Sequence, residues 1–67
     1  MPISARNQLP GTIASIKLGG VMAEVIVSVG EYEMVSVVTR QSVEDLGLAE
    51  GDQVTAIIKS TEVILAK

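Results

Sequence analysis

The chain has 67 residues, of which 48% are hydrophobic, 19% are charged and none is cysteine or histidine, and its net charge is −3. This composition excludes a disulfide framework and a zinc site of cysteine and histidine ligands, and no apolar run approaches the roughly 20 residues of a membrane-spanning helix. An acidic chain with a single aromatic side chain also lacks the basic field and the stacking platforms of a nucleic-acid binder.

Residues 9–18, 21–29 and 33–39 are predicted to be the first three strands, because the β-branched residues valine and isoleucine are frequent in them. In the first strand the alternation is loose, and it places Ile13 and Ile16 on opposite faces. In the second and third strands apolar residues share a face: Val21, Ala23, Val25, Val27 and Val29, and then Val35 and Val37. Turns that contain glycine are predicted between the strands: Gly19-Gly20 and Gly30-Glu31.

A short helix is predicted over residues 40–47, where β-branched residues become rare. Thr39 has the side chain and the position of an N-cap. Ser42 and Asp45 have the spacing of a capping box, so a helix that starts one turn later is the alternative. Gly47 is expected to end the helix, because glycine is the residue most often found in the left-handed conformation after a last turn.

Residues 53–59 and 62–66 are predicted to be the last two strands. The order of three strands, one helix and two strands is that of an OB-fold. The sequence therefore predicts an all-β protein, a five-stranded OB-fold-like small barrel with one short helix between strands 3 and 4. No linker or repeat divides residues 1–67, so one domain is expected. A swapped-hairpin barrel of the transition-regulator type is the alternative, because LGLAEGDQV at 46–54 resembles such proteins.

The apolar content predicts that copies of the chain associate. A domain of this size buries only about 60% of its unfolded surface. A composition that is 48% hydrophobic exceeds what one small domain can hide, so we expect a homo-oligomer. No signal peptide is visible at the N-terminus, which favours a cytoplasmic protein.

Catalysis has few candidate residues in this chain. Without histidine and cysteine, the commonest general base and the thiol nucleophile are missing. The eight carboxylates fall mainly at predicted turns and on the helix, where solvated surface charge is the expected role. Gly19-Gly20 lacks the later glycine, lysine and helix of a phosphate-binding loop. We therefore do not expect an enzyme.

Three clusters of hydrogen-bond donors are candidates for binding an anion. They are the run Ser4–Asn7 with its arginine, Thr39 with Ser42 at the helix start, and Lys59 with Ser60. A lining made only of donors favours a fully deprotonated oxyanion over a protonated phosphate, which must donate a hydrogen bond. The alternative is that Arg6 is a surface residue, that Lys59 and Ser60 are turn residues and that Thr39 is only a cap.

Three segments resemble the molbindin (Mop) family: SARNQLPGTI at 4–13, TRQSVEDLGLAEGDQV at 39–54 and AIIKSTEVILA at 56–66. That family consists of small cytoplasmic molybdate-binding proteins. The resemblance implies OB-fold subunits that assemble as a hexamer, a trimer of dimers, with oxyanion sites between subunits. It further implies reversible binding of molybdate and tungstate for molybdenum storage, without a covalent cofactor, a nucleic-acid partner or a membrane partner.

The resemblance also implies which residues hold the oxyanion. The first site comprises Ser4, Ala5, Arg6, Thr39, Lys59 and Ser60. In it, the arginine and the lysine would supply charge, while the serines, the threonine and backbone N–H groups would supply donors. A second site comprises Gly19, Gly20, Val21, Met22 and Ser42. The alternatives are a DNA-binding protein of the swapped-hairpin type and an assembly domain without any ligand.

Overall fold

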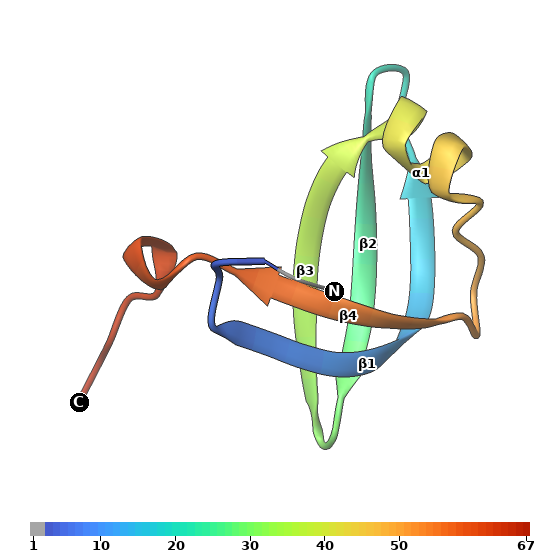
Figure 1. The fold of residues 1–67 in the computed structure, drawn as a ribbon. Coiled ribbons are helices and arrows are strands. Elements are labelled where there is room, and N and C mark those ends of the chain that lie inside the picture. The colour runs from blue at the N-terminus through green and yellow to red at the C-terminus, as the bar shows by residue number, and fades with distance from the viewer. Residues whose placement is uncertain (1–2) are drawn as a thin grey trace.

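The computed structural model describes residues 3–67, and these form one antiparallel sheet with a short helix at its upper end (Figure 1). The sheet has four strands in the order β3-β2-β1-β4. The elements follow the chain as β1 (Asn7–Leu18), β2 (Met22–Val29), β3 (Tyr32–Thr39), α1 (Arg40–Leu46), β4 (Gln53–Ile58) and the 3-10 helix η1 (Ser60–Glu62). The predicted all-β class and the position of the helix after the third strand are confirmed.

Strand β1 bends, so that its two halves pair with different strands. Its first half pairs with β4, and its second half pairs with β2. In Figure 1 the first half of β1 and β4 run together across the β2–β3 hairpin. A β-bulge lies between Ile13 and Ser15, where the register to β2 shifts by one residue. The prediction that Ile13 and Ile16 face opposite sides was wrong, because the extra residue turns both toward the core.

The helix begins and ends where the sequence predicts. Thr39 is the N-cap, and its Oγ1 accepts a hydrogen bond from the Ser42 backbone N–H at 3.0 Å. The alternative start one turn later is wrong. Gly47 follows the helix with a φ of 62°, and its N–H donates to the Glu44 carbonyl. The Leu48 N–H donates to the Val43 carbonyl at 3.0 Å, which completes a Schellman motif.

The core is small and lies between the sheet and the helix. Its buried members are Ile13, Ala23, Val25, Val27 and Val43. Three of them lie on the alternating face of β2, as predicted, whereas Val35 and Val37 of β3 share the opposite face and are 64% and 62% exposed. Within residues 3–67, no helix has both the length and the apolar character to cross a membrane.

The predicted fifth strand is absent. Residues 60–67, here called the C-terminal arm, begin with η1 and continue without pairing to any strand among residues 3–67. In Figure 1 the arm leaves the end of β4 and points away from the sheet. Residues 62–66 carry the predicted apolar content, and Ile64 and Leu65 are 93% and 89% exposed. The physical reason is that a strand needs a neighbour, and the arm has none among residues 3–67.

Candidate functional site

The β1–β4 ladder brings two of the three donor clusters together. Its last pair joins Asn7 to Ile58, which lie 51 residues apart in the sequence. Arg6 directly precedes that pair on one strand, and Lys59 directly follows it on the other. The ladder stops at this pair, so Arg6 and Lys59 each lie one residue beyond it. The run at Ser4–Arg6 and the pair Lys59-Ser60 therefore lie at the same end of the β1–β4 ladder.

Side-chain hydrogen bonds hold the first of these clusters against the ladder. The half-buried Asn7 side chain donates from Nδ2 to the carbonyl oxygen of Ile58 at 3.2 Å. The Gln8 side chain donates from Nε2 to the carbonyl oxygen of Ala5 at 2.9 Å. Both residues belong to β1, which starts two residues earlier than predicted. The N-terminal donor run is thus attached to the sheet on both sides of Arg6.

The two cations in this cluster are available to an external anion. Arg6 and Lys59 are both exposed. Among residues 3–67 the salt bridge found joins Arg40 to Glu44, and neither Arg6 nor Lys59 takes part in it. With both cations one residue beyond the same strand pair, this end of the sheet carries local positive charge, although the net charge of the chain is −3.

The remaining predicted site residues meet at the other end of the sheet, beside the helix. The segment Gly19–Met22 forms the β1–β2 turn, in which the Gly19 N–H donates to the Met22 carbonyl at 2.8 Å. The Arg40 N–H donates to the Val21 carbonyl at 2.8 Å, so the turn touches the start of α1. A cavity of about 340 Å³ opens there. It is lined by Gly20, Val21, Thr39, Arg40, Gln41 and Glu44.

Sequence reasoning missed Arg40 as a member of this second cluster. Its Nη1 donates to the Gly19 carbonyl at 3.2 Å, and its Nε lies 3.8 Å from Oε1 of Glu44. The guanidinium therefore links the β1–β2 turn to the helix. A signal existed in the sequence, because Arg40 is one of five basic residues and directly follows Thr39.

The six residues predicted for the first site are not brought together in one chain. Arg6 and Lys59 lie where β1 begins and β4 ends, whereas Thr39 lies where β3 ends beside α1 (Figure 1). Within one chain, Arg6 and Thr39 therefore belong to different ends of the fold.

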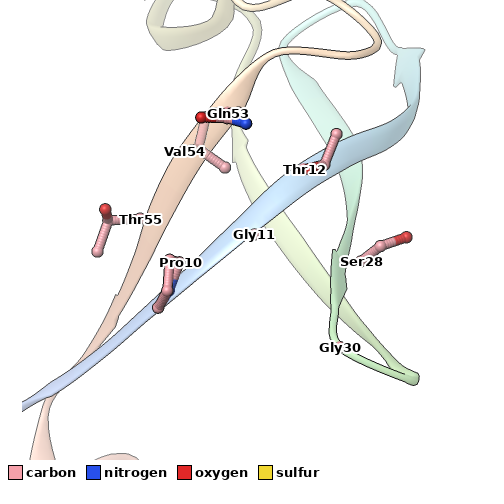
Figure 2. Close-up of a pocket in the computed structure, with 8 residues that line it drawn as sticks. All are labelled: Pro10, Gly11, Thr12, Ser28, Gly30, Gln53, Val54 and Thr55. Carbon is pink, nitrogen blue, oxygen red and sulfur yellow. The ribbon is translucent and has the colours of Figure 1, made fainter.

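A polar cleft near the β2–β3 turn was not singled out from the sequence. It has a volume of about 490 Å³ and is lined by Pro10, Gly11, Thr12, Ser28, Gly30, Gln53, Val54 and Thr55. Figure 2 shows that the hydroxyls of Ser28 and Thr55 point away from each other. The lining also contains no charged side chain. The cleft therefore lacks the converging donors and the positive charge that an oxyanion requires.

A third cavity is apolar and lies between the two edge strands of the sheet, β3 and β4. We call it the open groove. It has a volume of about 400 Å³ and is lined by Ile13, Val25, Ser36, Val38, Leu46, Leu48, Val54, Thr55 and Ile57. Its base is the hydrophobic core, which is open to solvent at this point.

Comparisons with known proteins identify the family. A TOBE domain matches residues 3–65. Molybdenum-pterin-binding protein 3 of Clostridium pasteurianum is 47% identical over 66 residues, which make up 97% of this chain and 97% of that protein.

Two solved structures agree with the sequence match. A molybdate-binding protein from Sporomusa ovata superposes with a TM-score of 0.96 and 43% identity, covering 100% of each chain. The cytoplasmic molybdate-binding protein ModG, solved with molybdate bound, superposes with a TM-score of 0.89 and 42% identity over 96% of this chain and 46% of its own. Since the TOBE domain spans nearly all of the residues and the small relatives match over almost their whole length, this chain belongs to the TOBE domain family, as a member of its molbindin (Mop) group.

Proposed function

We propose that this protein reversibly binds molybdate, and tungstate in the same way, and that it stores molybdenum in the cytoplasm as a single-domain subunit of a homo-oligomer. The observation that supports the proposal is the Asn7–Ile58 pair at the end of the β1–β4 ladder, because Arg6 and Lys59-Ser60 directly adjoin it in the sequence. Its relatives from Clostridium pasteurianum and Sporomusa ovata are molybdenum-pterin-binding and molybdate-binding proteins, and ModG is cytoplasmic.

The ligand chemistry follows from the donors at this end of the sheet. Two cations balance the two charges of a molybdate ion, and the hydroxyls of Ser4 and Ser60 with nearby backbone N–H groups supply neutral donors. The site offers no general base and no nucleophile with an activating partner, so its proposed role is binding and not catalysis. Hydrogen phosphate is disfavoured because its proton would meet only donors.

The proposed first site is shared between subunits. Ser4, Ala5 and Arg6 together with Lys59 and Ser60 form one wall from a single chain. Thr39 lies at the opposite end of the sheet, so the Thr39 hydroxyl in this site belongs to a second copy. The turn Gly19–Met22 with Ser42, now joined by Arg40, forms the proposed second site beside that hydroxyl.

The C-terminal arm and the open groove support association of copies. The groove exposes apolar side chains between two edge strands whose outer hydrogen-bonding groups have no neighbour in the sheet. The arm carries Ile64 and Leu65 in solvent. An arm from a second copy in the groove would cover the apolar surface of both and supply the fifth strand of an OB-fold barrel. The proposed assembly is a hexamer built as a trimer of dimers.

The test is a calorimetric titration of protein whose oligomeric state has been measured by sedimentation. Molybdate and tungstate are expected to bind and phosphate to bind much more weakly, while sulfate, which also carries no proton, measures how far the site selects by size. Arg6→Ala and Lys59→Ala are each expected to lower the affinity for molybdate by about ten- to a hundredfold, because each removes a charged hydrogen-bond donor. The matched control is Lys17→Ala, which removes an exposed cation from the far half of β1.

Two results would contradict the proposal. Wild-type protein that shows no heat of binding with molybdate would exclude the function. Unchanged affinity in both the Arg6 and the Lys59 variant would exclude this site. An assembly domain without a ligand predicts instead that none of the four anions raises the melting temperature, whereas a true ligand raises it as its concentration increases.

A further inference from the structure

Asn7 stands where the two chain segments of the proposed site separate. It is the first residue of β1 and pairs with Ile58, the last residue of β4. Its side-chain Nδ2 donates to the Ile58 carbonyl at 3.2 Å. The side chain is half-buried, so this hydrogen bond is partly shielded from water. Arg6 precedes Asn7, and Lys59 follows Ile58. The Asn7 amide therefore joins the two strands one residue before the two cations.

This hydrogen bond acts against an electrostatic repulsion. Arg6 and Lys59 each lie one residue beyond the Asn7–Ile58 pair, and the described part of the chain places no carboxylate in a salt bridge with either. Before an anion binds, repulsion between the two positive charges favours separation of the segments. Beyond the ladder, the backbone hydrogen bonds that would resist this separation have ended. Among residues 3–67, the Asn7 side chain thus makes the last hydrogen bond between the two strands before the segments separate.

Building on the proposed function, we infer that Asn7 is a positioning residue for the oxyanion. It does not touch the anion. Its hydrogen bond to Ile58 keeps Arg6 and Lys59 close together in the free protein, so that less ordering is required when the dianion arrives. Gln8 acts on the same side, because its bond to the Ala5 carbonyl at 2.9 Å holds the chain that carries Arg6.

The test compares two variants in which leucine replaces an amide side chain of the β1–β4 ladder. Asn7→Leu keeps a similar shape and removes the donor to Ile58. Gln53→Leu is the matched control, because Gln53 is exposed and pairs with Thr12 at the other end of the ladder, beside the cleft that has no charged side chain. Both are titrated with sodium molybdate well below their melting temperatures. Asn7→Leu is expected to bind about three- to tenfold more weakly, as for the loss of one hydrogen bond, and Gln53→Leu as tightly as wild type.

The salt dependence of the molybdate affinity distinguishes a positioning role of Asn7 from the loss of a charged group. Both cations remain in Asn7→Leu, so its affinity is expected to fall with added sodium chloride as steeply as in wild type. Arg6→Ala has lost one cation, so its affinity is expected to depend less on salt. Asn7→Gln retains an amide donor and is expected to recover part of the affinity. If Asn7→Leu does not fold, Asn7→Ser, whose hydroxyl is too short to replace the amide, is compared in its place.

The outcomes distinguish this inference from the function on which it rests. Wild-type affinity in the folded Asn7 variant, with tight binding by wild-type protein, would overturn the role of Asn7 and leave the function standing. Equal losses of affinity in the Asn7 and Gln53 variants would also overturn it, because an amide at the other end of the ladder would then matter as much. Absence of binding by wild-type protein would overturn the function itself.

Discussion

Thr39 is the residue at which the fold and the proposed site meet. Its Oγ1 accepts from the Ser42 N–H at 3.0 Å and lies 2.7 Å from Ser42 Oγ. A hydroxyl has one donor and two acceptor lone pairs. When Ser42 supplies the hydrogen of the contact between the two hydroxyls, both lone pairs of Thr39 are used and its own O–H points elsewhere. Helix capping is thus compatible with donation from Thr39 to an oxyanion.

Replacing Thr39 tests both roles. Thr39→Ala is expected to lower the free energy of unfolding by about 1 kcal/mol, because the first turn of α1 loses its cap. It is also expected to weaken molybdate binding, because the second copy no longer supplies a hydroxyl. Thr39→Ser retains both properties and serves as the control. The measurements are thermal melting without anion and calorimetric titration with it; a melting shift with unchanged affinity would leave Thr39 only a cap.

At the scale of elements, β1 connects the two proposed sites. Arg6 precedes its first residue, and the Gly19–Met22 turn follows its last. The bulge at Ala14 and the close approach at Gly11 let this one strand pair with β4 and β2 in turn. A Cβ added at Gly11 would lie 2.7 Å from both the Ser28 carbonyl oxygen and Val27 Cγ1. Glycine is required there because the backbones pass too closely for a side chain.

Gly11→Ala is therefore expected to destabilise the fold by about 1–3 kcal/mol, the usual cost of forcing extra volume into a packed region. Gly20→Ala is the matched control, because a Cβ at Gly20 meets nothing within 4 Å. The measurement is chemical denaturation of both variants. Equal stability of the two would show that β1 and β2 can move apart at this point without cost.

At the scale of the whole molecule, more apolar surface is exposed than the fold needs. Only five hydrophobic residues of the described chain are buried, while Ile64, Leu65, Val35 and Val37 are each more than 60% exposed. The open groove adds a path from solvent to the core. This distribution resembles half of an interface more than the surface of an isolated monomer.

The arm is expected to control assembly. The double variant Ile64→Ser with Leu65→Ser removes the two most exposed apolar side chains of the arm. Sedimentation is expected to show that it is smaller than wild type, and calorimetry that it binds molybdate weakly, because its sites are no longer shared. Lys67→Ser, which alters the same arm without removing apolar surface, is expected to assemble normally. If the double variant sediments with the same mass as wild type, the arm does not hold the copies together.

Local signals explain what could be predicted from the sequence. Alternation identified β2, the cap Thr39 and the glycine Gly47 bounded the helix, and the glycines at 19 and 30 marked the turns. These features depend on residues a few positions apart. The placement of SARN and Lys59-Ser60 at the same end of the ladder depends on the pairing of Asn7 with Ile58, which are 51 residues apart, so local sequence patterns do not show it.

The features that were missed depend on contacts that the sequence does not encode locally. The bulge arises because β1 serves two neighbours, and no glycine or proline marks it at Ala14. The role of Arg40 depends on where the Gly19 carbonyl lies. The segment 62–66 has the composition of a strand, yet it finds no neighbour in its own chain. The prediction was right about its chemistry and wrong about its pairing.

The small core has a consequence for how this protein responds to its own concentration. Where so few side chains are buried within one chain, folding and association become a single equilibrium governed by mass action. Under the proposed assembly, dilution dissociates and unfolds the subunits, so the stability of the protein increases with its concentration. Bound oxyanion shifts the same equilibrium, so a cell rich in molybdate would preserve its store of the protein along with the ion.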